Sequence, residues 1–335
     1  MKITPGKLAG LKAVSNERNV IAAAAMDQRG SLQKSLAKER GASADAHDLE
    51  VFKTLVTEVL TQYASAILLD PEYGLPAAKH RNGKGLLLAY EKTGYDATTH
   101  GRLPDLLDLW SVRRLAEAGA DCIKILLYYT PLDRPAVNDV KHAWVERIGD
   151  ECRAHDIPFF LELVGYDEHG NDEKAIEYAR KKPTVVSGGM KEFSKPRYGV
   201  DVLKVEVPIN IEYVAGTQAN KGESAYTRAE ALDLFRASAA ETTLPFIYLS
   251  AGVSNPVFIE TLQLAGESGV SFNGVLCGRA TWKDGIAIYA KQGTDAFRKW
   301  LETTGVENIQ NVNKALEAAS PWYLKFGAKS LEELG

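Results

Sequence analysis

Hydrophobic residues gather along the chain in short runs that are separated by helical patterns. Eight runs have the length and composition of β-strands: 19–27, 65–70, 85–91, 122–129, 158–166, 201–208, 245–252 and 274–282. Between them, apolar residues recur every three or four positions, as on one face of a helix, over 49–64, 104–119, 138–155, 227–241 and 255–268. Strands that alternate with helices predict parallel β–α–β units, and eight such units make a TIM (β/α)8 barrel.

An open, doubly wound sheet is the alternative α/β fold. Two nucleotide-binding signatures typical of such sheets, a GxGxxG turn after the first strand and a GxxxxGK[ST] loop, do not occur in the sequence. No Pro/Ser-rich linker or low-complexity tract divides the 335 residues. We therefore expect a single domain over residues 1–335, with the barrel core at about 19–304 and a helical C-terminal extension at about 305–335.

Charged residues interrupt three of the predicted strands. In DVLKVEVP (201–208), Lys204 and Glu206 share one face, and the residues between them form an apolar face. Lys124 and Glu162 oppose apolar faces in the same way in the fourth and fifth strands. An edge strand would expose such charges to water, but a closed barrel has no edge strands. In a barrel the apolar face packs beneath the helices, so these charges should point toward the barrel axis.

Further polar residues stand at the ends of predicted strands. Asp27 follows AAAAM in the first predicted strand, Ser250 follows YL in the seventh, and Arg279 follows LCG in the eighth. The carboxyl ends of the strands are where TIM barrels assemble their chemistry. A structural ion pair explains one buried charge as well as catalysis does. Ionisable groups from five strands favour a functional site, because each buried charge is costly unless it is paired or used.

The lysines and the glutamate form a set that is suited to covalent catalysis of a carbonyl reaction. Desolvation or a neighbouring cation such as Lys124 lowers the pKa of an amine and makes Lys204 a nucleophile. A deprotonated lysine forms a Schiff base with a ketone, and the iminium accepts electrons when an adjacent carbon–carbon bond breaks. Glu162 is the candidate general acid and base. The structural alternative for Glu162 is a salt bridge to a lysine.

A phosphate site is predicted beside these residues. The run SAGVS (250–254) leads into a predicted helix, whose N-terminal amides favour an anion. Alone, SAGVS reads as an ordinary helix cap. Arg279 adds a forked cationic donor, and the loops after the seventh and eighth strands of TIM barrels are a frequent phosphate site.

Composition narrows the classes of ligand and cofactor. The net charge of −4 gives no reason to expect nucleic acid or a membrane as a partner, so we expect a small molecule. No apolar run approaches the ~20 residues of a membrane span, and the N-terminal residues do not resemble a signal peptide, which predicts a cytoplasmic protein. The six histidines show no HxH or HExxH spacing, so we expect no metal; carboxylates could bind Mg²⁺, but those named above are better used by the lysines. A covalent imine on lysine needs no other cofactor. Exposed helices allow a homo-oligomer.

Eight segments in order carry a resemblance to a known family: AMDQRG (25–30), YASAILLDPEYGLPA (63–77), LLLAYEKTGYD (86–96), IKILLYY (123–129), IPFFLEL (157–163), DVLKVEVP (201–208), YLSAGVS (248–254) and FNGVLCGRATW (272–282). The chain resembles the class I tagatose-1,6-bisphosphate aldolases. The resemblance implies a metal-independent TIM barrel that reversibly cleaves a ketohexose 1,6-bisphosphate to dihydroxyacetone phosphate and glyceraldehyde 3-phosphate. It also implies a role in galactose or lactose breakdown through tagatose 6-phosphate.

The resemblance extends to individual site residues. It implies that Lys204 forms the Schiff base and that Glu162 is the acid/base. It also implies substrate and phosphate contacts from five residues, with Arg29 as a further candidate: Asp27, Gln28, Lys124, Ser250 and Arg279. Two alternatives stay open, an aldolase for 6-deoxy-6-sulfofructose 1-phosphate and a phosphosugar-binding regulator without catalysis. The preferred stereoisomer and the role of Glu206 are not fixed by the sequence.

Overall fold

The eight predicted strands close into one parallel barrel in a computed structural model that describes residues 3–92 and 99–334. Each strand pairs with its neighbours in chain order, and β1 pairs with β8. The TIM-barrel prediction is therefore confirmed. Residues 93–96 of the LLLAYEKTGYD segment lie outside the described residues. The strands are β1 (Ile21–Met26), β2 (Ala66–Leu69), β3 (Gly85–Ala89), β4 (Cys122–Tyr128), β5 (Phe159–Val164), β6 (Val202–Val205), β7 (Phe246–Leu249) and β8 (Gly274–Cys277).

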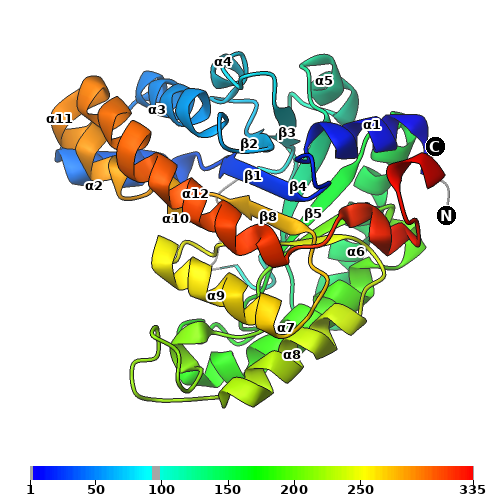
Figure 1. Cartoon of the computed structure of the whole chain (residues 1–335). Helices are drawn as coiled ribbons and strands as arrows, with labels where there is room; N and C mark the ends of the chain where they lie inside the picture. The colour runs from blue at the N-terminus through cyan, green and yellow to red at the C-terminus, as the bar shows by residue number, and fades with distance from the viewer. Residues whose placement is uncertain (1–2, 93–98, 335) are drawn as a thin grey trace.

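Helices surround the barrel and follow the strands along the chain (Figure 1). They are α1 (Pro5–Ala13), α2 (Gly30–Arg40), α3 (Ala46–Leu60), α4 (Leu75–Ala78), α5 (Val112–Glu117), α6 (Pro135–Ala154), α7 (Ile176–Phe193), α8 (Arg228–Ala240), α9 (Asn255–Glu267), α10 (Arg279–Trp282), α11 (Gly285–Trp300) and α12 (Val306–Ala315). The helices expected after the barrel are present. Within the described part of the chain, no helix is both long and apolar enough to cross a membrane.

Two predicted boundaries were wrong. The helix expected over 104–119 is limited to α5, which begins after Ser111, whose hydroxyl accepts the backbone N–H of Arg114. The preceding Leu106 instead forms an isolated antiparallel bridge with Glu91. The strand expected over 274–282 ends at Cys277, and helix α10 follows it.

Helix α7 was not among the predicted helices because Pro183 and two glycines interrupt its pattern. Proline has no N–H for the carbonyl four residues before it, here that of Ala179. The hydroxyl of Tyr226 donates to this carbonyl instead. Gly188 allows the helix to approach Pro131, because a Cβ there would lie 2.6 Å from the Pro131 ring. Tertiary contacts therefore hold a helix that its sequence alone specifies weakly.

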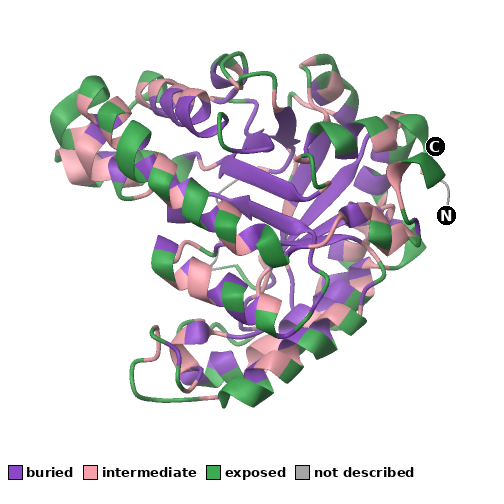
Figure 2. Ribbon diagram, viewed as in Figure 1, coloured by how far each residue is buried: buried purple, intermediate pink, exposed green. Residues whose placement is uncertain are grey.

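The strands are buried (Figure 2), and they separate two apolar layers, as the alternation predicted. Outward-facing residues such as Ile123, Leu161 and Leu203 pack under the helices. The opposite faces, which include Phe160 and Val202, fill the barrel interior. Lys124, Glu162 and Lys204 occupy the inward-facing positions, above these apolar residues along the strands. The interior is thus apolar toward the amino ends of the strands and charged toward their carboxyl ends.

The chain's two terminal segments close the amino end of the barrel. Leu11 from α1 and Trp322 from the C-terminal turns are fully buried against the interior apolar layer. The Trp322 indole N–H donates to the Ser15 hydroxyl at 2.9 Å, and its backbone N–H donates to the Asn19 carbonyl. Figure 1 shows α1 and the last residues on the same side of the barrel. These segments, which the sequence pattern did not place, therefore complete the core.

Replacing Trp322 with alanine is expected to lower the free energy of unfolding by about 3–5 kcal/mol, because it empties a fully buried site. Chemical denaturation monitored by circular dichroism measures this change. Leu324→Ala is the matched control, since Leu324 lies in the same turn but is 46% exposed, and it should change stability by less than about 0.5 kcal/mol. Equal stabilities of the two variants would contradict the packing role.

Candidate active site

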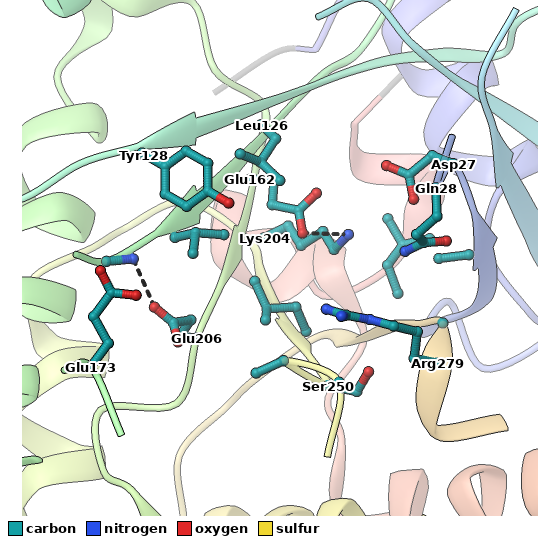
Figure 3. Close-up of a pocket in the computed structure, with 18 of the residues that line it drawn as sticks. Asp27, Gln28, Leu126, Tyr128, Glu162, Glu173, Lys204, Glu206, Ser250 and Arg279 are labelled. Atoms are coloured by element: carbon teal, nitrogen blue, oxygen red, sulfur yellow. Dashed lines mark hydrogen bonds and ion pairs between the residues drawn. The ribbon is translucent and has the colours of Figure 1, made fainter. Parts of the chain in front are cut away.

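A cavity of about 290 Å³ opens at the carboxyl ends of the strands. Six of the seven predicted site residues line it: Asp27, Gln28, Glu162, Lys204, Ser250 and Arg279. In Figure 3, Lys204 and Glu162 lie in its centre, and Arg279 and Ser250 lie together at one end. The seventh, Lys124, is fully buried and contacts two of the lining residues. The predicted residues, drawn from six strands or strand ends, thus converge on one place.

Lys124 is the centre of a buried ion cluster. Its Nζ lies 2.8 Å from an Asp27 oxygen, 2.9 Å from Glu91 Oε1 and 2.8 Å from Glu162 Oε2. Burial alone would lower the pKa of Lys124, but the three carboxylates outweigh it and hold that pKa well above its ordinary value. Lys124 therefore stays an ammonium ion.

Glu162 connects the two lysines. Its other oxygen, Oε1, lies 2.8 Å from Lys204 Nζ, so one carboxylate bridges two ammonium groups. Strand pairing makes this contact, because Glu162 and Lys204 are direct partners across β5 and β6 and both side chains point inward. Burial would raise the pKa of Glu162, but the charges of Lys124 and Lys204 hold it below its ordinary value. Glu162 is thus ionised and within proton-transfer distance of Lys204.

The other carboxyl groups of the cluster differ in charge. Burial raises the pKa of Asp27, but Lys124, Lys204 and Lys53 together hold that pKa far below its ordinary range. For Glu91, burial outweighs Lys124 and Arg29 and raises the pKa. Glu91 Oε1 contacts Lys124 at 2.9 Å, and Glu91 Oε2 has no hydrogen-bond partner within the described chain. Asp27 therefore supplies negative charge to the cavity, whereas Glu91 is drawn toward its neutral form.

Arg29, a weaker candidate from the sequence, does not line this cavity but borders an adjoining one, which it shares with Asp27 and Gln28. Its side chain is 3% exposed, and it donates to Glu72 at 2.6 Å and to the Glu91 carbonyl at 2.8 Å. The Glu72 contact joins Arg29 to the turn that follows β2. These contacts commit much of its guanidinium to the protein.

The guanidinium of Arg279, unlike that of Arg29, is exposed to the cavity and can contact a ligand. Within residues 3–92 and 99–334 it forms no ion pair, although its guanidinium lines the cavity. It lies against Gly252, where a Cβ would be 2.7 Å from the Arg279 Cζ, and where φ is +77°. Only glycine accommodates both this contact and this conformation. Lys283 donates to the Gly252 carbonyl at 3.1 Å and adds a second cation at this end.

The loop that carries Gly252 ends at a helix, as the sequence predicted. Ser254 is the residue before α9, and Asn255 begins the helix. Ser250, Gly252 and Arg279 line the same cavity, and the loop continues from Gly252 into the N-terminus of α9. Backbone amides and a free guanidinium are donors that suit a phosphate group.

Glu206 lines the same cavity but does not partner Lys204. It pairs with Lys182 of α7 at 3.2 Å and accepts the Gly165 N–H at 2.7 Å. Figure 3 places Glu206 and Glu173 on the side away from Arg279. The question that the sequence left about Glu206 is answered in part: it neutralises a lysine, and that lysine is Lys182.

Three polar residues at this end of the barrel escaped the sequence analysis: Lys53, Asp70 and Glu91. Glu91 and Asp70 each directly follow an apolar run, which is the signal that identified Asp27. Lys53 lies on the apolar face of its helix, four residues after Leu49, where a charge is unexpected. Among the residues described, no group of three His, Cys, Asp or Glu side chains is arranged to hold a metal ion.

Comparisons with known proteins identify the fold and the family. A solved fructose-bisphosphate aldolase from Plasmodium falciparum has the same fold, with a TM-score of 0.68 over 96% of this chain and 97% of that one, at 14% sequence identity. A Listeria monocytogenes protein named tagatose 1,6-diphosphate aldolase is 55% identical over 330 residues, which are 98% of this chain and 97% of that protein. Proteins of the same name are 54% identical in Enterococcus faecalis (97% of this chain, 98% of that protein) and 53% identical in Staphylococcus aureus (94% and 97%).

The family resemblance found in the sequence is thereby confirmed. A family model described as DeoC/LacD family aldolase matches residues 21–284, which include every barrel strand and every predicted site residue. This protein belongs to the DeoC/LacD family of aldolases, because the family model matches residues 21–284 of its 335 residues and relatives more than 50% identical match nearly the whole chain.

Proposed function

We propose that this protein is a class I aldolase that reversibly cleaves D-tagatose 1,6-bisphosphate, and other ketohexose 1,6-bisphosphates, to dihydroxyacetone phosphate and D-glyceraldehyde 3-phosphate. The observation that carries the proposal is the Lys204–Glu162 pair, at 2.8 Å, in a cavity that also presents Arg279, which forms no ion pair with the described residues. The names of the relatives support the choice of substrate.

The first step joins the substrate to Lys204. The Lys204 ammonium transfers a proton to Glu162 and attacks the C2 carbonyl of the open-chain sugar as a free amine. The resulting carbinolamine loses its oxygen as water, with Glu162 as the proton donor, and leaves a cationic iminium on Lys204. The Asp27 carboxylate favours this cation electrostatically, because Asp27 and Lys204 lie close enough for their charges to interact.

Carbon–carbon cleavage follows from the iminium. Glu162, ionised again, removes the proton of the C4 hydroxyl, and the C3–C4 bond breaks. The bonding electrons move into the iminium and give a neutral enamine on Lys204, while C4 leaves as the aldehyde of glyceraldehyde 3-phosphate. Protonation of the enamine at C3 restores the iminium, and its hydrolysis by water releases dihydroxyacetone phosphate and returns Lys204 as the ammonium ion.

The remaining residues bind and orient the substrate. Ser250, the neighbouring loop amides and Arg279 hold the phosphate on the dihydroxyacetone half, beside the site of attack. Asp27 and Gln28 bind hydroxyl groups, and Lys124 keeps Glu162 and Asp27 ionised. The proposed reaction uses no metal or other cofactor. Its charged sugar phosphates do not cross a bilayer unaided, so we place the enzyme in the cytoplasm, as a possible homo-oligomer.

Purified protein is expected to cleave D-tagatose 1,6-bisphosphate, as measured by a coupled assay for dihydroxyacetone phosphate. EDTA should leave the rate unchanged, because the lysine provides the electron sink. The kcat/KM for this substrate should exceed that for 6-deoxy-6-sulfofructose 1-phosphate. Absence of turnover would favour a phosphosugar-binding regulator, and the reverse preference would favour the sulfosugar reaction. Loss of activity on chelation would point to a metal-dependent mechanism.

Borohydride reduction in the presence of dihydroxyacetone phosphate is expected to attach the triose covalently to Lys204. Peptide mass spectrometry locates the adduct, and Lys124, which shares Glu162 with Lys204, is the internal comparison. Lys204→Ala should lose both the adduct and cleavage. An adduct on Lys124, or no adduct in a protein that cleaves the substrate, would refute the assignment of the nucleophile.

Glu162→Gln is expected to lower kcat by about 10²- to 10⁴-fold, because the amide cannot move protons. Glu206→Gln is the matched control, since Glu206 lines the same cavity but pairs with Lys182. It should reduce kcat by less than about tenfold, because it removes no proton-transfer group. Steady-state kinetics of both variants make the comparison, and a larger effect at Glu206 would reassign the acid/base.

A further inference from the structure

A buried lysine on α3 supports the end of β1 from behind. Lys53 is fully buried, and its Nζ lies 2.7 Å from the Met26 carbonyl, 2.7 Å from the Gln28 carbonyl and 2.5 Å from Asp70 Oδ1. Carbonyls two residues apart in extended backbone point to the same side, so one ammonium group reaches both. All three donor hydrogens of Lys53 are therefore used.

The two carbonyls flank Asp27, whose side chain faces the cavity. Strand β1 and its pairing with β2 both end at Met26, so Gln28 lies beyond the sheet. Lys53 links the last strand residue to this segment by binding both carbonyls. It thereby fixes the backbone on both sides of the carboxylate that contacts Lys124 at 2.8 Å.

The turn after β2 completes this support. Asp70 binds Lys53 with one oxygen and accepts the Tyr73 N–H with the other, at 2.8 Å. Two residues later, Glu72 holds Arg29, which also donates to the Glu91 carbonyl. The DPEYG segment thus anchors both Lys53 and Arg29 behind the residues that line the cavity.

Stability alone does not explain a charge at this place. Burial lowers the pKa of Lys53, which shows that the charged form is costly there. Replacing a buried ion pair with apolar residues of similar size is often neutral or stabilising. The neighbours of Lys53 on the buried face of α3 include Leu49, Phe52 and Val56, so an apolar residue would suit the packing.

From these contacts, the geometry points to Lys53 as a positioning residue of the active site, which acts with Asp70 through the Met26 and Gln28 carbonyls to hold Asp27 and Gln28 in place for the aldol reaction. It does not touch the substrate. The catalytic part of this inference rests on the proposed function, whereas its structural part concerns the backbone at residues 26–28 alone.

The test uses the double variant Lys53→Met, Asp70→Asn. Methionine fills the lysine's volume, and asparagine removes the unpaired charge but keeps an oxygen for the Tyr73 N–H. The thermal unfolding temperature should therefore recover relative to Lys53→Met alone, while the two carbonyls stay unsupported. The control is Lys7→Met, which breaks the Lys7–Asp201 ion pair, 2.9 Å long, at the closed end of the barrel.

The kcat and KM of the two variants test the positioning role of Lys53. The double variant should lose about 100-fold in kcat, since displacing catalytic groups by about 1 Å has effects of this size. Its KM should rise by a smaller factor than kcat falls, because the phosphate contacts at Ser250 and Arg279 are intact and only the hydroxyl contacts of Asp27 and Gln28 are displaced. Lys7→Met should lower the unfolding temperature and leave kcat unchanged. Near-wild-type kcat in the double variant, or an equal loss of kcat in Lys7→Met, would overturn the inference.

Hydrogen exchange followed by mass spectrometry separates this inference from the proposed function. Peptides that cover residues 21–32 should exchange faster in the double variant, whereas peptides from β6 should not change. Unchanged exchange at residues 21–32 would overturn the positioning role, whatever the reaction is. A wild-type protein that cleaves no ketohexose bisphosphate would instead refute the proposed function, and the exchange measurement would still decide the role of Lys53.

Discussion

The sharing of the Glu162 carboxylate between two ammonium groups is the contact on which the site depends. Each Glu162 oxygen contacts one lysine at 2.8 Å. Moving either lysine would therefore change the electrostatic interaction between Glu162 and the other lysine. Lys124 is fully buried and requires the three carboxyl groups around it. Lys204 borders the cavity, and Glu162 is its ion-pair partner in the described structure. The arrangement keeps one lysine permanently charged and places the other beside a proton acceptor.

The barrel makes this arrangement possible through its two opposed layers. Parallel pairing aligns Glu162 with Lys204, and the inward faces bring Lys124 and Asp27 from other strands to the same depth. Below them the interior is apolar, so water has no access from the closed end. Charge in such a place interacts strongly, because little solvent screens it. The fold thus supplies the low-dielectric surroundings in which a few ionisable groups control one another.

Much of this could be predicted from sequence, for identifiable reasons. The alternation of strands and helices along the chain predicted the barrel. The alternation of side chains within each strand predicted that Lys124, Glu162 and Lys204 point inward. The partners of Lys53 and Glu206 could not be predicted. Lys53 is a single charged residue on the apolar face of a helix, and nothing near it in the sequence indicates its partners. The partner of Glu206, Lys182, lies on α7, whose helical pattern is interrupted by Pro183. Contacts between distant segments decide both.

Helix α1 and the C-terminal turns, which close the amino end of the barrel, lie at the end opposite the cavity and contact the same apolar layer. A tag, a fusion partner or a surface attachment joined at either terminus would therefore stand away from the mouth of the cavity. The same proximity makes the protein a natural candidate for circular permutation, with a short linker between the old ends and new termini in an exposed outer loop.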